Sequence, residues 1–414
     1  MHPGLAWQML IGLAVGALAG TIAHAGWVDG GMVAWTVTNL IEPVGAIFLR
    51  LLFMLVLPLV VSGLALGVAG VGDARTLGRI GLRTLVYTVG VSTIAVLLGV
   101  GLVNLVRPGE GLPDTVRQAL AARASTLPAP ATAPSTGAAF FVHLVPANIV
   151  QAMADGDMLA VMVFALLLGI GLVLTQTAAA RRFEEALTGL YEVTMRLLEV
   201  VLRAAPIGVA CLLCSLTART GWELLRPLSA YVAVVLTALA IQQFVVYALL
   251  VRFLGGMPPL TFYRGIRAAM LTAFSTASSN ATLPTALKVA DEELHLPPHV
   301  SRFVLTIGST ANQNGTALFE GVTVLFLAQF YGVALTLAQQ VMVVAICILG
   351  GIGTAGVPAG SLPVIAMILG MIGVPPDGIG MILGIDRFLD MCRTTLNVSG
   401  DLVAAVVVAR GETR

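Results

Sequence analysis

The last apolar segment of the chain, residues 376–409, carries charged and polar side chains at helical spacing. Counted from Asp386, they follow after 4, 7, 8, 11 and 15 residues, a series that places them on one face of a helix. They are Asp390, Arg393, Thr394, Asn397 and Asp401. Each charge at the centre of a bilayer costs at least about 2.5–3.5 kcal/mol, so this face predicts a ligand, an ion or charged partners. A purely structural ion-pair network is the alternative; it accounts for Arg393 and one aspartate but leaves acids in surplus. Arg387 lies off this face, and we expect a packing or interfacial role for it.

A run of amides interrupts the preceding apolar segment, 298–330. The residues are Asn312, Gln313 and Asn314, followed by Gly315 and Thr316. Three consecutive amides before a glycine do not suit an ordinary membrane helix. They favour an unwound stretch whose carbonyl and side-chain oxygens could bind a hard cation. A cluster of amides bonded to each other between helices is the alternative.

The composition indicates that these polar residues lie in a membrane protein. Apolar residues make up 58% of the 414-residue chain and charged residues 10%, against about 25% charged in a soluble domain. A water-soluble enzyme and a disordered chain are therefore excluded, and the net charge of +1 gives no sign of a nucleic-acid partner. Long apolar stretches predict helices at 5–25, 42–70, 80–106, 157–176, 188–216 and 226–254. The Pro/Ala/Thr/Ser-rich stretch from Pro108 to Thr136 predicts an exposed loop.

Basic residues predict the orientation of these helices in the bilayer. They follow alternate apolar segments, at Arg75, Arg79, Arg83, Arg181, Arg182, Arg252, Arg264, Arg267, Arg410 and Arg414. The positive-inside rule makes that side cytoplasmic, with both termini on it.

Two segments in the last third are too polar, or too rich in glycine and proline, to be simple spans. They are residues 274–284 and 350–363, and each ends in Thr/Ser-Leu-Pro. Paired broken segments in corresponding halves are typical of a transporter binding site at the membrane midplane. Two ordinary loops outside the membrane are the alternative.

At these motifs the sequence resembles the dicarboxylate/amino acid:cation symporters, the glutamate transporter family. The resemblance rests on Asn312 with Gly315-Thr316, on the run from Gly353 to Pro358, and on the series from Asp386 to Asp401. It implies an all-α membrane protein with eight transmembrane helices, two re-entrant helical hairpins, inverted repeats, a homotrimer and elevator-type transport. Residues 1–255 would form mainly the scaffold and trimer contacts, with the third and sixth helices contributing to the transport domain. Residues 256–414 would form the transport-domain core, comprising hairpin 258–288, helix 298–330, hairpin 338–372 and helix 376–409.

The resemblance assigns substrate roles residue by residue. Arg393 matches the arginine that binds the substrate's side-chain carboxylate, for which a guanidinium fork is suited. Asp390 matches the residue that binds the α-amino group. Further contacts are implied for Ser278, Ser279, Thr316, Val357, Thr394 and Asn397. Together Arg393 and Asp390 favour glutamate or aspartate, because a C4-dicarboxylate has no amine for Asp390 and a neutral amino acid would leave Arg393 unpaired.

The ion sites implied by the resemblance are only partly retained. Asn314 replaces an aspartate of one sodium site, and two of the three aligned positions at Thr88, Val91 and Ser92 also differ, so we expect that site to be lost. A second sodium site matches Gly308, Asn312, Asn397 and Asp401. A third would use the backbone near Thr310 and Gly351, where the Gln313 amide could replace the cation. We therefore expect fewer sodium ions than in sodium-coupled relatives, down to none.

Two further positions bear on coupling and affinity. Glu320 matches a glutamate that carries a proton in the proton-coupled branch of the family, and burial would favour its protonated form. A hydrogen-bonded or interfacial glutamate is the alternative.

Ala277 and Met391 occupy positions where relatives carry an auxiliary arginine, which we expect to be absent.

The function expected is symport of glutamate or aspartate across the cell inner (plasma) membrane by a multi-pass protein. The coupling ion would be H+ and/or Na+, with proton coupling favoured, and no cofactor is expected. The alternatives are a sodium-coupled symporter, a C4-dicarboxylate symporter, and a channel-like or receptor-like protein without coupled transport. An enzyme is not expected, since the chain has no HExxH, GxSxG, SxxK or P-loop pattern.

Overall fold

The structure, a computed structural model, describes residues 4–27, 31–69, 78–110, 145–155, 158–221, 225–353, 361–375 and 378–410. Every regular element in these ranges is a helix, which confirms the all-α class. In the first part of the chain they are α1 (Gly4–Trp27), α2 (Met32–Thr36), the π-helical turn η1 (Val37–Ile41), α3 (Glu42–Met54), α4 (Val56–Ala69), α5 (Gly78–Val106), α8 (Ile149–Asp155), α9 (Met158–Leu174), α10 (Ala178–Arg203) and α11 (Ala205–Thr220). A long helix follows as α12 (Leu225–Ile241), η3 (Gln242–Val246), α13 (Tyr247–Leu249) and η4 (Leu250–Leu254).

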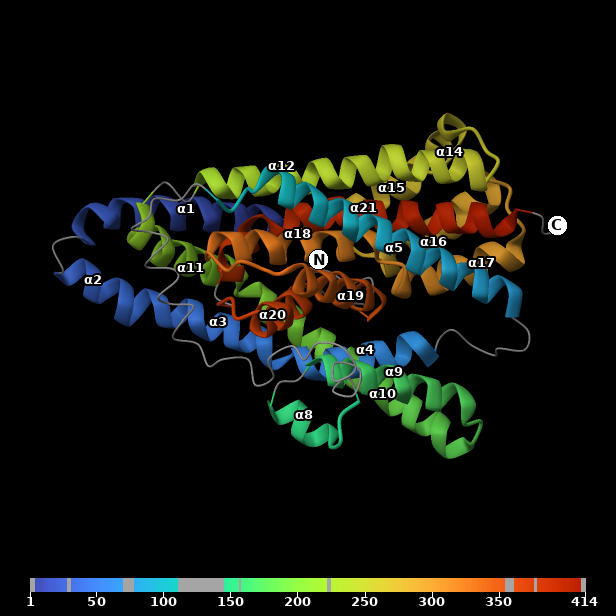
Figure 1. The fold of residues 1–414 in the computed structure, drawn as a ribbon, viewed down its shortest axis with the longest axis horizontal. Helices are drawn as coiled ribbons and strands as arrows, with labels where there is room; N and C mark the ends of the chain where they lie inside the picture. Colours follow the sequence, from blue (N-terminus) through green and yellow to red (C-terminus); the bar gives the residue numbers. More distant parts are fainter. Residues whose placement is uncertain are drawn as a thin grey trace.

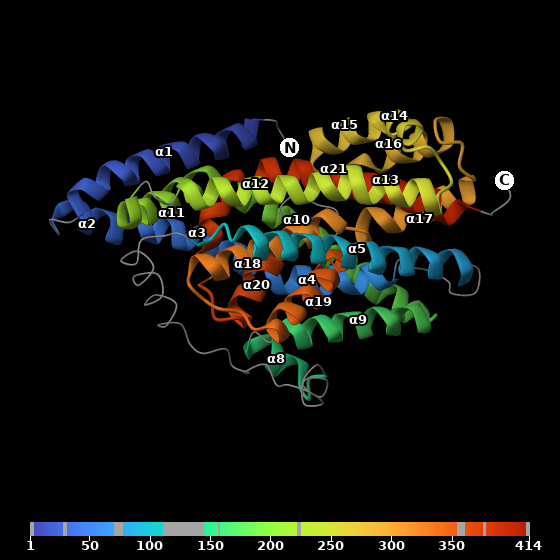
Figure 2. The ribbon, with the colours of Figure 1, turned by 45° about the horizontal axis from the view of Figure 1, so that its top comes forward.

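Most of the remaining helices are shorter, and several are separated by breaks. They are α14 (Pro259–Gly265), α15 (Arg267–Thr276), α16 (Ser279–Glu292), α17 (Pro298–Ala311), α18 (Asn314–Phe330), α19 (Leu337–Gly353), α20 (Ser361–Met371) and the long α21 (Ile379–Ala409). In Figures 1 and 2, α21 runs lengthwise through the bundle, and it contacts α1, α11, α12, α15, α16, α17 and α18. The polar stripe of α21 therefore lies where elements from both ends of the chain meet.

Most helices expected from hydropathy are present, but two are divided. The segment expected at 42–70 breaks at Leu55 into α3 and α4, three residues before Pro58. The single helix expected at 188–216 is wrong, because α10 and α11 meet at Ala204 with a bend of 58°. Pro206 lies in the first turn of α11, and a proline cannot supply the N–H that would continue the helix through this point. The expected loop from Pro108 to Thr136 lies outside the described residues beyond Glu110.

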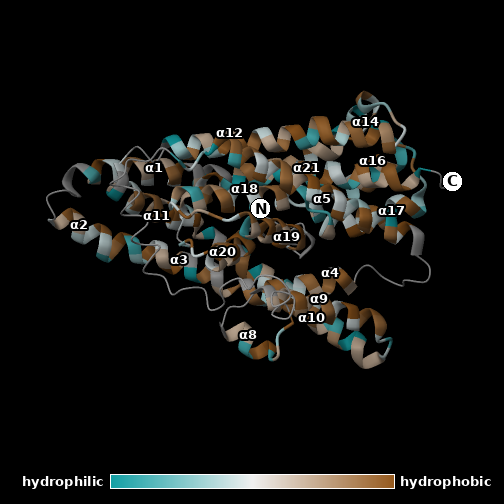
Figure 3. Ribbon diagram, viewed as in Figure 1, coloured by the Kyte–Doolittle hydropathy of each residue, from teal (hydrophilic) through white to brown (hydrophobic). Residues whose placement is uncertain are grey.

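Three described helices are long and apolar enough to cross a bilayer, and the bent pair α10–α11 would make a fourth. The three are residues 80–106, 226–254 and 379–409. Brown, hydrophobic residues make up much of the helical ribbon in Figure 3. Many large apolar side chains are exposed, among them Leu18, Leu82 and Phe253. A surface of this kind suits lipid, as expected for a membrane protein.

The broken segments of the last third appear as helix–break–helix pairs. Helices α15 and α16 contact each other on either side of a turn at Ala277, whose φ of 49° is left-handed. Ser278 caps α16, accepting a hydrogen bond from the Ala281 N–H at 3.2 Å. Helices α19 and α20 also contact each other, and the tip between them, including Val357, lies outside the described residues.

Three glycines of α1 allow it to pack closely on α11. Gly12, Gly16 and Gly20 are spaced four apart and buried, so they form one stripe along the helix. A Cβ on any of them would collide with backbone oxygens of α11, at Pro206, Ala210 and Cys214. Small residues at this spacing permit close backbone approach in membrane helices, where van der Waals packing drives association.

Replacing Gly16 with leucine should therefore separate α1 from α11. We expect the free energy of unfolding to fall by about 1–3 kcal/mol or more, as for other over-packed cores, and the melting temperature in detergent to fall with it. Gly101→Leu is the matched control, because a Cβ at Gly101 in α5 meets nothing within 4 Å. Equal melting temperatures for the two variants would contradict this account of the packing.

Candidate functional site

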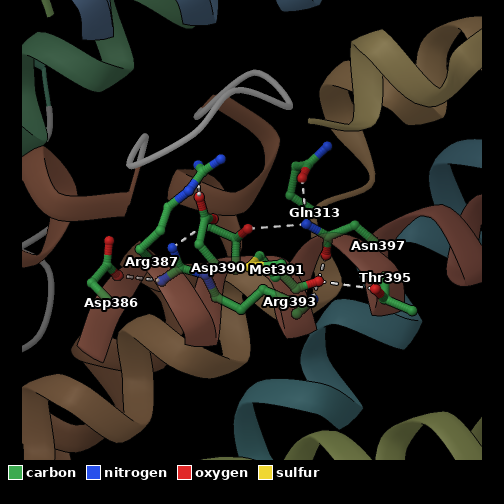
Figure 4. Close-up of polar contacts among 10 residues, drawn as sticks. Gln313, Asp386, Arg387, Asp390, Met391, Arg393, Thr395 and Asn397 are labelled. Atoms are coloured by element: carbon green, nitrogen blue, oxygen red, sulfur yellow. Dashed lines mark hydrogen bonds and ion pairs between the residues drawn. The ribbon is translucent and has the colours of Figure 1, made fainter. Parts of the chain in front are cut away.

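The polar stripe of α21 forms a buried ion-pair cluster. Arg393 is 1% exposed, and its Nη2 donates to Asp390 Oδ1 at 2.7 Å. Its Nη1 lies 3.2 Å from Asp386 Oδ1, and its Cζ lies 3.9 Å from the centre of the Phe319 ring. Figure 4 shows the four charged side chains of this stretch of α21 side by side. The arginine is thus held by two carboxylates and an aromatic face, although its Nε and Nη1 have no hydrogen-bond partner in the described part of the chain.

Arg387 belongs to this cluster, which corrects the expectation of a packing or interfacial residue. Its Nη1 lies 3.6 Å from Asp390 Oδ2, and its side chain is only 11% exposed. Residues three apart on a helix are neighbours, so a long side chain at 387 reaches the carboxylate at 390 although the two lie on different stripes.

Beside this cluster, the expected unwound stretch is present but only two residues long. Helix α17 ends at Ala311 and α18 begins at Asn314, while Asn312 and Gln313 take non-helical backbone angles. The turn faces α21. Asn397 Nδ2 donates to Gln313 Oε1 at 2.5 Å and to Thr316 Oγ1 at 3.1 Å, and Asn397 Oδ1 accepts the Gly315 N–H at 2.7 Å. Asn397 therefore fastens the break between α17 and α18 to the charged stripe.

Three of the four residues expected to form the second sodium site, Gly308, Asn312 and Asp401, meet one turn beyond Asn397 on α21. Asp401 is buried, and its Oδ1 accepts from Asn312 Nδ2 at 2.8 Å. Gly308 passes so close that a Cβ on it would lie 2.5 Å from the same oxygen. The Asn312 Oδ1 is buried without a hydrogen-bond partner in the described part of the chain. A buried carboxylate beside this amide oxygen is a donor set that suits a hard cation. Asn397, the fourth expected residue, is bonded to Gln313 and Gly315 in the turn that follows Asn312.

The surroundings of Asn314 differ from the Asp401–Asn312 site, because both polar atoms of the Asn314 amide are hydrogen-bonded to neutral partners. Ser92 Oγ donates to its Oδ1 at 2.6 Å, and its Nδ2 donates to Tyr247 Oη at 3.1 Å. Thr88 and Val91 are buried on the same helix as Ser92. These contacts leave this position with amide and hydroxyl oxygens in place of a carboxylate.

Glu320 is completely buried in α18, and neither of its carboxyl oxygens has a hydrogen-bond partner in the described ranges. A Cβ on Gly350 of α19 would lie 2.9 Å from Glu320 Oε2. The alternative for this residue was a hydrogen-bonded or interfacial glutamate, and its burial and its oxygens without a partner in the described ranges favour neither. An ionised carboxylate without partners is costly in such a place, so the neutral, protonated form is favoured.

The other expected site residues lie around this core. Ser279, at the start of α16, is buried, and its hydroxyl has no hydrogen-bond partner among the described residues; α16 contacts α21. Thr394 is buried beside Arg393 in sequence. Thr310 is half-buried, and its hydroxyl donates to the Ile307 carbonyl of its own helix at 3.0 Å. A Cβ on Gly351 would lie 3.2 Å from the Gln313 carbonyl oxygen, so α19 approaches the break.

Three contacts of this core were not expected from the sequence. Phe319 stacks on Arg393, Arg387 pairs with Asp390, and Tyr247 pairs with Asn314. The three-residue spacing of Arg387 and Asp390 was a signal that could have revealed their pair. Nothing in the local sequence marks Phe319 or Tyr247, since both look like ordinary apolar helix residues.

Comparison with known proteins gives one consistent result over nearly the full chain. Residues 5–411 match the model of the sodium:dicarboxylate symporter family. The chain is 34% identical to the proton/glutamate-aspartate symporter of Escherichia coli (strain K12), with 99% of this chain and 93% of the relative covered. It is 33% identical to the proton/sodium-glutamate symport protein of Bacillus subtilis (strain 168), with the same coverage. It is 30% identical to excitatory amino acid transporter 3 of Mus musculus, over 88% of this chain and 78% of the relative.

Proposed function

The chain belongs to the sodium:dicarboxylate symporter family, and from that premise we propose that it is a symporter of the acidic amino acids glutamate and aspartate. The relatives at 32–34% identity carry names that specify proton/glutamate-aspartate or proton/sodium-glutamate symport. A family made up of transporters suggests that the protein is not an enzyme.

The observation that carries the substrate assignment is the buried pair of Arg393 and Asp390. The guanidinium is complementary to the side-chain carboxylate of the substrate, and the carboxylate of Asp390 is complementary to its α-amino group. In the structure Arg393 Nη2 donates to Asp390 Oδ1 at 2.7 Å. An acidic amino acid offers both charges at once, so it can replace each partner of this pair without leaving a buried charge alone. Ser278, Ser279, Thr316, Thr394, Asn397 and, on the second hairpin, Val357 complete the proposed substrate contacts.

For coupling, we assign the proton to Glu320. Its complete burial, and the lack of a hydrogen-bond partner for its oxygens in the part of the chain that the structure describes, support a carboxyl that is neutral when the site is loaded. Sodium, as a co-transported ion, would have its best site at Gly308, Asn312, Asn397 and Asp401. The neutral contacts of Asn314 with Ser92 and Tyr247 support the loss of the sodium site there. The donation from Asn397 to Gln313 supports an amide in place of a cation near Thr310.

The proposed architecture extends these assignments to the whole molecule. It has eight transmembrane helices and two re-entrant hairpins arranged as inverted repeats, in a homotrimer of the cell inner membrane with cytoplasmic termini. Residues 256–414 would move as the transport-domain core, with the third and sixth helices, against a scaffold formed by most of residues 1–255. The contacts of α21 with α15, α16, α17 and α18 support one moving body for the second half of the chain.

The proposed function is tested by binding and transport of L-aspartate by the purified protein. We expect saturable binding that strengthens as pH falls, depends only weakly on sodium, and supports counterflow in proteoliposomes. Steep sodium dependence without pH dependence would replace proton coupling by sodium coupling. Competition by succinate but not by aspartate would indicate a C4-dicarboxylate symporter. Flux without saturation or exchange would indicate a channel.

A further inference from the structure

Arg387 carries a charge with only 11% of its side chain exposed, and the proposed function gives it no role. We propose that it is a positioning residue for Asp390 which determines how strongly the site requires an α-amino group in its ligand. The inference rests on the proposed function, in which Asp390 binds that amino group. It concerns selectivity within the site and adds a residue that does not itself touch the substrate.

The geometry is a chain of alternating charges on two turns of α21. Asp386 lies 3.2 Å from Arg393, Arg393 lies 2.7 Å from Asp390, and Asp390 lies 3.6 Å from Arg387. The four side chains are between 1% and 11% exposed. Two carboxylates and two guanidiniums give the cluster a net charge of zero. Arg387 is the last member of this series of alternating charges (Figure 4).

The two oxygens of Asp390 have different cationic neighbours. Oδ1 accepts from Arg393, and Oδ2 faces Arg387. A substrate carboxylate that takes the guanidinium of Arg393 competes with Oδ1 of Asp390 for it. Asp390 then needs compensation from another cation, because a buried carboxylate without one is costly. The substrate's amino group supplies this compensating positive charge. Arg387 supplies part of the compensation whether or not the ligand has an amino group.

With Arg387 present, the site should therefore bind a ligand without an amine more tightly than the same site would without Arg387. Without Arg387 the cluster would hold two carboxylates and one guanidinium, a net charge of −1. A dicarboxylate lacking an amine would then add its own negative charges to a cluster that is already negative, whereas aspartate would bring its ammonium group. Removing Arg387 should therefore weaken binding of the amine-free ligand far more than binding of the amino acid.

The test compares L-aspartate with succinate, which has the same carbon chain and both carboxylates but no amine. Inhibition constants of both are measured against labelled aspartate in the wild type, Arg387→Met, Arg387→Lys and the control Arg302→Met. Arg302 is exposed on α17, so the control removes one positive charge outside the cluster. We expect the preference for aspartate over succinate to rise roughly tenfold or more in Arg387→Met, to stay near wild type in Arg387→Lys, and to be unchanged in the control.

Equal weakening of both ligands in Arg387→Met, or an unchanged ratio, would overturn the inference and leave a merely structural ion pair. A similar rise in Arg302→Met would overturn it too, because the effect would then be one of overall charge. If Arg387→Met does not fold, as judged by its melting temperature, Arg387→Gln takes its place with the same expectation. Failure of the wild type to bind aspartate would contradict the proposed function itself. Failure of the inference about Arg387 can therefore be distinguished from failure of the proposed function.

Discussion

Replacing Arg393 with methionine is expected to abolish high-affinity binding of L-aspartate and L-glutamate. The substitution removes the only guanidinium positioned between Asp386 and Asp390 in the described part of the chain, so the substrate's side-chain carboxylate would be buried without a partner. Breaking a buried ion pair costs about 3–5 kcal/mol, which corresponds to a loss of roughly two to four orders of magnitude in affinity. Isothermal titration with purified protein measures this directly.

Arg393→Lys is the matched control for the charge. An ammonium group keeps the positive charge but loses the planar fork and the stacking on Phe319, so we expect an intermediate affinity. Binding of a neutral amino acid such as serine should be affected far less, or gained, since it brings no carboxylate that requires Arg393. Retention of wild-type aspartate affinity in Arg393→Met would show that the carboxylate is bound elsewhere.

Replacing Glu320 with glutamine is expected to remove the pH dependence of uptake. In the wild type, lowering the external pH should raise the rate, because a larger fraction of carriers then has a neutral carboxyl at this buried position. Glutamine is neutral at every pH and nearly isosteric, so the variant should transport at a rate that does not change between pH 5 and 8. Initial rates in proteoliposomes, at fixed membrane potential, give the profile.

Glu293→Gln is the control for this variant, since Glu293 is exposed in the turn after α16 and lies outside the proposed site. Its pH profile should match the wild type. A pH dependence that persists unchanged in Glu320→Gln assigns the proton to another group. Loss of substrate-driven proton movement in Glu320→Gln, with exchange retained, would support the assignment.

The helical stripe of α21 was predictable from the sequence because it is a local property. Spacings that fit a turn of 3.6 residues place Asp386, Asp390, Arg393, Asn397 and Asp401 on one face whatever the helix packs against. The breaks at Ala277 and at Asn312-Gln313 were predictable for a similar reason. Clusters of small and amide residues in an apolar segment weaken the local helix, and the structure has both breaks where such clusters occur.

The division between α10 and α11 was missed although its cause is local. A hydropathy argument averages the apolar character of the whole segment 188–216, so it does not register the missing N–H of Pro206 inside it. Arg387 was misjudged in a related way. The stripe was defined by the directions of Cβ atoms, while a long side chain at 387 reaches a carboxylate three residues away.

The sequence by itself determined that this is an all-helical membrane protein and which polar residues its core contains, because composition and periodicity are properties of single segments. Only the tertiary structure decided which of those residues satisfy one another. Asn314 meets Ser92 and Tyr247, which are 222 and 67 residues away, and Asp401 meets Asn312 across 89 residues. Contacts of this kind depend on how separate helices pack. The same packing leaves the Glu320 oxygens unpartnered in the described ranges and gives Asp390 a second arginine.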